Sequence, residues 1–314
     1  MDSSNKIGLT SVISPVEEIL SALFQRFDLR LFIKRDDKLH PHISGNKWRK
    51  LKYNLRQARQ LGHNRLLTFG GAYSNHLAAT AAAGKEYGFS TLGVVRGEKV
   101  LPLNPTLKYV ESCGMELRFV SRTNFRNKNQ NSIFEDLKVN PNMYYVLPEG
   151  GSNCLALKGV AELVNEIIDQ LGSPPDFLCT ACGTGATMAG LVSGAKRKSK
   201  ILGIPVLKGG FMESEVRQFL AACGEPLNKE WKIVDGYHFG GYAKYKPELI
   251  QFINHFKEKF GIPLDPIYTG KLVFALFDLA EKGFFRKKST VVILHTGGLQ
   301  GITGFNERHG QLIQ

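Results

Sequence analysis

The sequence predicts an α/β protein in which mostly parallel sheets are covered by helices on both faces. Two observations carry this prediction. Short runs of β-branched and aromatic residues alternate with longer stretches of helical periodicity, and glycine or proline marks the junctions between them. A length of 314 residues corresponds to one large or two modest domains, at about 100–200 residues per domain.

Eight strands are predicted in chain order, at residues 66–69, 91–96, 115–121, 143–147, 177–180, 201–206, 232–235 and 290–295. Helical segments are predicted near residues 45–61, 74–87, 105–113, 153–171, 184–199, 213–222, 246–260 and 270–283. In sheets of this kind, ligands bind outside the carboxyl ends of the strands, in the loops that lead into helices. Four of these loops are rich in glycine, and they begin near residues 69, 148, 181 and 295. We therefore expect the functional site at these four loops.

Composition and charge exclude several classes of protein. Apolar residues make up 43% of the chain and charged residues 22%, which are ordinary values for a globular protein. No apolar run approaches the roughly 20 residues that span a bilayer, and the first residues resemble no secretion signal. The net charge of +13 is spread over short clusters. This distribution favours an anionic small ligand over nucleic acid or a membrane surface.

The cysteine pattern bears on compartment and on metal binding. Five cysteines are an odd number, which argues against a disulfide framework and for a reducing compartment, so we expect a cytoplasmic protein. Cys179 and Cys182 form a Cys-x-x-Cys pattern, but Cys179 lies inside an apolar strand and the chain offers no second ligand pair for zinc. We expect buried, inert thiols and no metal site.

Lys47 is a candidate nucleophile at the start of a basic helix. Leu51, Leu55, Ala58 and Leu61 form one apolar stripe at helical spacing, and Lys47 falls in the middle of it. Arg49 projects elsewhere on the same wheel, and Lys50 lies at the edge of the stripe. Burial and the positive end of the helix dipole both disfavour an ammonium group, and a neutral amine can attack a carbonyl to form a Schiff base. The alternative is a lysine whose amine simply extends to solvent from the helix start.

The segment Gly183-Thr184-Gly185-Ala186-Thr187 follows a strand and opens a helix. Its backbone N–H groups and the two threonine hydroxyls can converge on an anion at the positive end of the helix dipole. It matches neither a Walker loop nor the Gly-x-Gly-x-x-Gly pattern. We expect it to bind a phosphate group, and the alternative is a tight turn with close helix packing.

Ser74, Asn75 and His76 stand at the start of an alanine-rich helix. Serine at this position commonly caps the helix. The same three residues also form a second anion cradle suited to a carboxylate, with Ser74 as a nucleophile or hydrogen-bond donor. No Gly-x-Ser-x-Gly pattern surrounds Ser74, so hydrolase chemistry has little support.

With these residues identified, the sequence resembles the pyridoxal-phosphate enzymes of fold type II, the tryptophan-synthase-β-like group. It most resembles the branch that contains D-cysteine desulfhydrase and 1-aminocyclopropane-1-carboxylate deaminase. The matching segments follow the family's order, at residues 33–37 (Ile-Lys-Arg-Asp-Asp), 45–51 (Gly-Asn-Lys-Trp-Arg-Lys-Leu), 74–76, 182–187, 264–271 (Leu-Asp-Pro-Ile-Tyr-Thr-Gly-Lys) and 295–298 (His-Thr-Gly-Gly). The cofactor that this resemblance implies is pyridoxal 5'-phosphate.

The resemblance also implies roles for individual residues. Lys47 is similar to the lysine that carries the cofactor, and Gly183, Thr184, Gly185, Ala186 and Thr187 to the loop that holds its phosphate. Asn75 matches a contact to the ring oxygen or the substrate carboxylate, with Ser74 and His76 in the same pocket. Tyr268 matches a tyrosine beside the substrate, and Tyr242 a second one. Thr296 resembles the hydroxyl that faces the pyridine nitrogen, although Thr269 is left open for this role.

Position 269 separates the two activities of the branch. The deaminases carry glutamate directly after the tyrosine, where this chain has Thr269. A carboxylate keeps the pyridine nitrogen protonated and makes the ring a strong electron sink, which suits the opening of a cyclopropane. A neutral hydroxyl suffices when a departing β-thiolate takes up the electrons. We therefore predict α,β-elimination on a small amino acid, D-cysteine first, yielding pyruvate, hydrogen sulfide and ammonia. The open alternatives are 1-aminocyclopropane-1-carboxylate deamination and a non-catalytic protein that binds the cofactor or an amino acid.

The fold implied by the resemblance has two three-layer α/β/α domains with mostly parallel sheets and the cofactor in the cleft between them. We expect a smaller domain at residues 43–154, carrying Lys47 and Ser74, and a larger one from residues 1–42 and 155–314, carrying the phosphate loop, Tyr268 and Thr296. A homodimer is implied by the resemblance alone.

Overall fold

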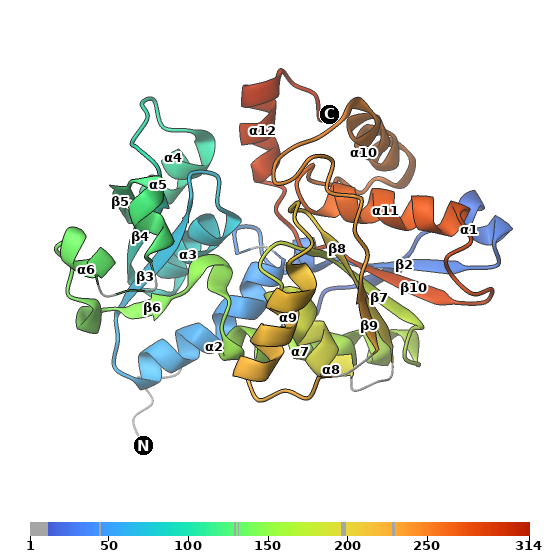
Figure 1. Ribbon diagram of the computed structural model, residues 1–314, viewed down its shortest axis with the longest axis horizontal. Helices are drawn as coiled ribbons and strands as arrows, with labels where there is room; N and C mark the ends of the chain where they lie inside the picture. Colours follow the sequence, from blue (N-terminus) through green and yellow to red (C-terminus); the bar gives the residue numbers. More distant parts are fainter. Residues whose placement is uncertain (1–11, 44, 129, 131, 196–198, 228–229) are drawn as a thin grey trace.

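The computed structural model describes residues 12–314 except 44, 129, 131, 196–198 and 228–229. It contains two sheets (Figure 1). The larger has the order β1-β2-β10-β7-β8-β9, and the smaller the order β5-β4-β3-β6. Every pairing is parallel except that of β1 with β2. This confirms the prediction of mostly parallel sheets.

The strands of the larger sheet are β1 (Val16–Glu18), β2 (Arg30–Lys34), β7 (Phe177–Cys182), β8 (Lys200–Pro205), β9 (Trp231–Ile233) and β10 (Thr290–Leu294). Those of the smaller sheet are β3 (Arg65–Gly71), β4 (Ser90–Arg96), β5 (Glu116–Val120) and β6 (Tyr145–Leu147). All eight predicted strands are present, and the prediction missed β1 and β2.

Eight helices match the predicted segments: α2 (Asn46–Gln60), α3 (Asn75–Tyr87), α4 (Pro105–Ser112), α7 (Cys154–Leu171), α8 (Ala186–Ala195), α9 (Met212–Ala222), α10 (Pro247–Phe260) and α11 (Thr269–Glu281). The predicted helix at 184–199 extends in part outside the described residues. Four further helices were not predicted: α1 (Ala22–Arg26), α5 (Arg122–Arg126), α6 (Ser132–Asp136) and α12 (Gly301–His309). None of the helices in the described part of the chain is long and apolar enough to cross a bilayer.

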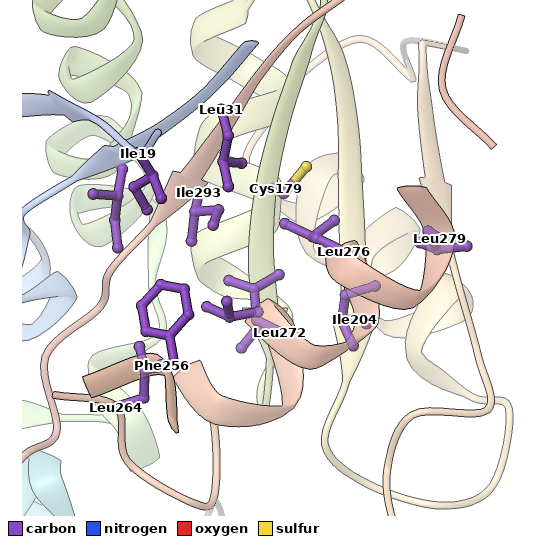
Figure 2. Close-up of a cluster of buried hydrophobic side chains, with 14 of the residues drawn as sticks. Ile19, Leu31, Cys179, Ile204, Phe256, Leu264, Leu272, Leu276, Leu279 and Ile293 are labelled. Carbon is purple, nitrogen blue, oxygen red and sulfur yellow. The ribbon is translucent and has the colours of Figure 1, made fainter. Parts of the chain in front are cut away.

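Helices cover both faces of the larger sheet. Successive residues of a strand point to opposite faces, so the apolar residues of one strand contribute to two separate cores. Figure 2 shows Leu272 and Leu276 of α11 facing Cys179 and Ile293 of the sheet. The neighbouring strand residues, Leu178 and Val292, belong to a second core with α7 and α8. The smaller sheet is likewise layered, with α2, α3 and α4 on one face and α5 and α6 on the other. The α/β class predicted from the sequence is confirmed.

Helix α2 runs from below the smaller sheet toward the larger one (Figure 1) and packs closely on α7. A Cβ atom at Gly159 of α7 would lie 2.0 Å from the carbonyl oxygen of Arg49, so only glycine permits this approach. Arg49 also makes ion pairs with Asp36 and with Glu166 of α7. The division of the chain at residues 43 and 154 stays a prediction. Helix α2 packs on α7, which covers the larger sheet, as well as on α3, which covers the smaller one.

The prediction about disulfides was wrong for one pair of cysteines. Cys154, the first residue of α7, forms a disulfide with Cys223, which follows the end of α9. The two residues are 69 positions apart in sequence, so an odd cysteine count could not reveal the pair. Cys179 and Cys182 are buried and free, as predicted, and burial raises the pKa of the Cys182 thiol to about 12.

Candidate active site

The amino end of α2 is pressed against the loop that follows β10. Gly45, the residue before α2, has a φ of 64°, and a Cβ atom there would lie only 1.8 Å from the carbonyl oxygen of Thr296. The backbone N–H of Asn46 donates to the same oxygen at 3.3 Å. Glycine is therefore the one residue that fits, and it places the first turn of α2 beside residues 296–297.

Lys47 lies in that first turn with its amine directed at the loop after β6. Its Nζ donates to the carbonyl oxygen of Gly150 at 3.4 Å. Burial lowers the pKa of Lys47 to about 8, because the charged form loses hydration that nothing else replaces. About a tenth of this amine is therefore neutral at pH 7, far more than for a lysine of ordinary pKa.

Lys50 shares this environment, which the sequence analysis did not anticipate. Its Nζ donates to the same Gly150 carbonyl oxygen at 3.3 Å, and burial, together with the charge on Lys47, lowers its pKa well below the usual range. Arg49 is buried as well, at 2% exposure. The helical-wheel prediction that placed Arg49 away from the buried face was wrong, because α7 encloses a second side of α2. Spacing gave a usable signal for Lys50, since residues i and i+3 share one face of a helix.

The predicted phosphate loop opens α8 and presents unused donors. Gly185 has a φ of 78°, and a Cβ atom there would be 3.1 Å from Val216 of α9. Within the described residues, no backbone N–H from Thr184 to Thr187 donates to a protein acceptor. The Thr184 hydroxyl is 2.8 Å from that of Ser152, and the Thr187 hydroxyl accepts from Asn46 at 2.9 Å. A cradle of free N–H groups at a helix start suits a phosphate.

The start of α3 carries Ser74, Asn75 and His76, and each has a distinct setting. The Ser74 oxygen accepts from the N–H groups of His76 and Leu77, so Ser74 caps α3 while its hydroxyl hydrogen stays available. Asn75 accepts from Gln300 at 2.9 Å and lies against Gly298. Asn75 therefore faces the loop after β10, where Thr296 lies.

His76 is only 2% exposed and points toward β3. Its Nε2 is 2.9 Å from the Thr68 hydroxyl, which itself donates to the Leu147 carbonyl. The hydroxyl proton is thus committed, so Nε2 carries the imidazole hydrogen and Nδ1 is a bare acceptor without a partner among the described residues. Burial lowers the pKa of His76 well below its usual value. Its predicted contact with substrate stays a prediction.

Two tyrosines complete the site. The Tyr268 ring lies against Gly183 of the phosphate loop, where a Cβ atom would be 3.1 Å from the ring. The Tyr242 ring lies 6.1 Å from that of Tyr268 in an edge-to-face arrangement. Burial raises the pKa of Tyr268 well above its usual range, so the phenol keeps its proton.

The hydroxyl of Thr269 is committed to the cap of α11. It donates to the Asp265 carboxylate at 2.7 Å and accepts from the Asp265 backbone N–H at 2.9 Å. Asp265 in turn accepts from the N–H groups of residues 267–269. Thr296 is 8% exposed and its hydroxyl makes no hydrogen bond to another described residue. Among the described residues, Thr296 is therefore the threonine of these two whose hydroxyl has no hydrogen-bond partner.

Loops that follow strands of both sheets therefore surround the Lys47 amine and the N–H groups of residues 184–187. The profile of the pyridoxal-phosphate-dependent enzymes matches residues 14–297, most of the chain. The chain belongs to the pyridoxal-phosphate-dependent enzyme family.

Relatives in this family narrow the branch. A Pyrococcus horikoshii protein provisionally named as a 1-aminocyclopropane-1-carboxylate deaminase is 33% identical over 287 residues, covering 88% of this chain and 87% of its own. The D-cysteine desulfhydrase of Yersinia pestis is 27% identical, with 96% of each chain covered. A solved structure described as an ACC deaminase homologue superposes with a TM-score of 0.84 at 30% identity, covering 96% of this chain and 94% of that one. The protein is thus an enzyme of the deaminase and desulfhydrase branch.

The residues present fit pyridoxal phosphate. Lys47 offers an amine of lowered pKa for the cofactor's aldehyde, and the free N–H groups of residues 184–187 offer donors for its phosphate. Thr296 lies in the loop that follows β10, next to the start of α2. A pyridine nitrogen could accept a hydrogen bond from its hydroxyl there. No group of His, Cys, Asp and Glu side chains able to hold a metal ion occurs in the described part of the chain.

Proposed function

We propose that this enzyme catalyses α,β-elimination on a small amino acid, with D-cysteine as the leading substrate. The net reaction consumes one water and yields pyruvate, hydrogen sulfide and ammonia. The observation that carries this proposal is the position of Lys47, whose amine of lowered pKa lies beside the Gly150 carbonyl, next to the phosphate loop. When bound, pyridoxal phosphate supplies an aldehyde that reacts with amines and a ring that accepts electrons from the substrate α-carbon.

In this proposal Lys47 acts twice. It holds the cofactor in the resting enzyme, and its amine, once released by the incoming substrate, removes the α-proton at Nζ. The lowered pKa suits this role, because the amine must be neutral to take up a proton. The Gly150 carbonyl, 3.4 Å from Nζ, orients the amine.

The substrate carboxylate is assigned to the start of α3. The Ser74 hydroxyl hydrogen is available, and the positive end of the α3 dipole favours an anion there. Tyr268 keeps its proton, so its hydroxyl can donate to the departing sulfur. Tyr242, beside Tyr268, covers the same side of the substrate.

Position 269 supports elimination over ring opening. No carboxylate occupies this position, and the Thr269 hydroxyl is committed to Asp265. The pyridine nitrogen is then left to the neutral hydroxyl of Thr296. A thiolate leaving group takes up the electron pair, so a weaker electron sink suffices. The second candidate, deamination of 1-aminocyclopropane-1-carboxylate, is favoured by the name of the Pyrococcus horikoshii relative.

A substrate panel tests the proposal. Purified enzyme loaded with pyridoxal phosphate is assayed with D-cysteine, L-cysteine, D-serine and 1-aminocyclopropane-1-carboxylate. Pyruvate, 2-oxobutanoate and sulfide are measured separately. We expect pyruvate and sulfide in equal amounts from D-cysteine. Turnover of the cyclopropane alone would replace the leading substrate by the second candidate, and absence of any 2-oxo acid would overturn the lyase assignment. The Lys47→Ala variant controls for cofactor chemistry in free solution.

The setting of the enzyme completes the proposal. We propose a homodimer that acts on a small amino acid and needs neither nucleic acid nor a membrane. The Cys154–Cys223 disulfide removes the argument from cysteine number for a cytoplasmic location. Sedimentation of the loaded enzyme at micromolar concentration tests the dimer, and a monomer mass would overturn it.

A further inference from the structure

Lys271 is a buried cation that the proposed reaction does not use. It lies in the first turn of α11, three residues after Tyr268, and its side chain is fully buried. Its Nζ donates to the carbonyl oxygens of His238 and Gly241, at 2.9 and 2.8 Å. Among the described residues it makes no ion pair within 4.0 Å, and Asp265 contributes only a longer-range attraction.

The acceptors belong to the segment that carries Tyr242. This segment, residues 238–243, includes Phe239 and Ala243 with φ values of 52° and 55°, a region that residues other than glycine rarely adopt. Gly240 and Gly241 also have positive φ. Backbone in such conformations persists only where surrounding contacts hold it. Lys271 supplies two of those contacts from the helix whose first turn follows Tyr268.

We propose that Lys271 is a positioning residue that fixes the Tyr242 segment to α11, so that the Tyr242 ring stays against Tyr268. The proposal deepens the proposed function and depends on it for the role of the two tyrosines. The start of α11 then determines the position of both tyrosine rings. It positions Tyr268 through the main chain and Tyr242 through the Lys271 amine.

The cost of burying this amine supports a positioning role. Burial lowers the pKa of Lys271 to about 8, which reports the penalty of holding a cation there. The two carbonyl oxygens would still accept a hydrogen bond if the Lys271 amine were absent. The His238 oxygen also accepts from the Gly241 N–H at 3.0 Å, and the Gly241 oxygen from the Lys244 N–H at 3.1 Å. An apolar side chain of similar length could therefore fill the site without leaving an unpaired carbonyl.

A double-mutant cycle tests the proposal. Lys271→Met removes both donors at similar volume, and Tyr242→Phe removes the hydroxyl that the segment presents. We expect Lys271→Met to lower kcat/KM for the active substrate by about 10- to 100-fold, mainly through kcat, with little change in cofactor affinity. In the Tyr242→Phe background the same change should cost less than about threefold, because the hydroxyl whose position depends on Lys271 is gone. Equal losses in both backgrounds would overturn the proposal.

A structural readout separates this proposal from the proposed function. Enzyme labelled with 3-fluorotyrosine gives a resonance for Tyr242, assigned by its loss in Tyr242→Phe. In Lys271→Met we expect this resonance to shift or broaden, with or without turnover of any amino acid. Lys271→Gln, which keeps one donor, should show a smaller change, and it replaces Lys271→Met if that variant does not fold. Lys282→Met, at an exposed lysine at the end of the same helix, is the matched control. An unchanged Tyr242 resonance in both Lys271 variants would overturn the proposal.

Discussion

Lys47 and Lys50 share one acceptor, the carbonyl oxygen of Gly150. Two buried amines in one place repel as ammonium ions, so at least one tends to lose its proton. Lys47 shows a pKa near 8. Lys50 also lies within electrostatic reach of Cys182, the residue before the phosphate loop. Lys50, whose pKa lies well below the usual range, is therefore a neutral hydrogen-bond donor beside Lys47, the amine assigned to the aldehyde.

Substitution of the two lysines should separate these roles. We expect Lys47→Ala to bind pyridoxal phosphate without a covalent link, so that borohydride reduction leaves no tagged peptide. Lys50→Met should keep the covalent link and weaken cofactor affinity by less than about tenfold, since it removes a hydrogen-bond donor but no charge. Peptide mass mapping and equilibrium dialysis measure the two effects. A tag on Lys50 in the wild-type enzyme would contradict this assignment.

Acidity should control cofactor loading through Lys47. Its pKa is lowered to about 8, so the amine is mostly protonated below that pH and mostly neutral above it. Because the neutral amine is the nucleophile, the rate of covalent loading should rise about tenfold per pH unit up to pH 7 and flatten above about pH 8. Stopped-flow absorbance of apo-enzyme mixed with pyridoxal phosphate measures it. A plateau reached only near pH 10 would show an unshifted lysine.

Helix starts organise the site at the scale of the element. Residues at or just before the starts of α2, α3, α8 and α11 contribute Lys47, Ser74, the phosphate loop and Tyr268. Each start is held by a specific contact. Gly45 packs against Thr296 at α2, and Ser74 caps α3. Gly185 packs against Val216 at α8, and the Asp265 carboxylate accepts from backbone N–H groups at α11. The unpaired N–H groups of a helix start make such positions suited to anionic groups.

Replacement of Gly45 by alanine should test how tightly α2 is placed. The added Cβ would overlap the Thr296 carbonyl oxygen at 1.8 Å, so we expect a loss of at least about 3 kcal/mol in unfolding free energy and poor cofactor loading. Gly62, just after α2, has a comparable φ of 77° with nothing within 4 Å of its Cβ. Gly62→Ala should therefore cost only about 1–2 kcal/mol. Urea unfolding compares the two, and equal losses would contradict the steric argument.

The sequence predicts features that depend on neighbouring residues better than features that depend on residues far apart in the chain. The strands and helices with clear periodicity were predicted, and so were the glycine-marked loops that hold the site. The short helices α5 and α6 have five residues each, too few for a helical period. The burial of Arg49 depends on α7, more than 100 residues later in the chain, with Glu166 117 positions away. The Cys154–Cys223 disulfide is likewise a tertiary contact, and no local pattern indicates it.

At the scale of the whole molecule, the disulfide ties together two helices that flank the phosphate loop. Cys154 begins α7 directly after the loop that carries Gly150 and Ser152, and Cys223 follows α9, whose Val216 packs on Gly185. The Cys154 side is exposed, so reductants can reach the bond. A cross-link over 69 residues chiefly restricts the unfolded chain.

Loss of the disulfide should therefore lower stability more than activity. We expect Cys154→Ser with Cys223→Ser to reduce the unfolding free energy by about 2–4 kcal/mol, and dithiothreitol to have the same effect on the wild-type enzyme but none on the variant. Cys113→Ser, at a free cysteine, is the matched control. Thermal unfolding measures the change. A wild-type protein indifferent to dithiothreitol would show that the bond does not form in solution.

The anchor formed by Lys271 has a consequence for how this enzyme could diverge. Lys271 recognises the main-chain oxygens of residues 238 and 241, which every amino acid possesses. Side chains along that segment can therefore be exchanged by mutation while its backbone keeps the same attachment. Directed evolution aimed at a new amino acid should accordingly draw its accepted changes from positions 239, 242 and 243, and should retain lysine at 271.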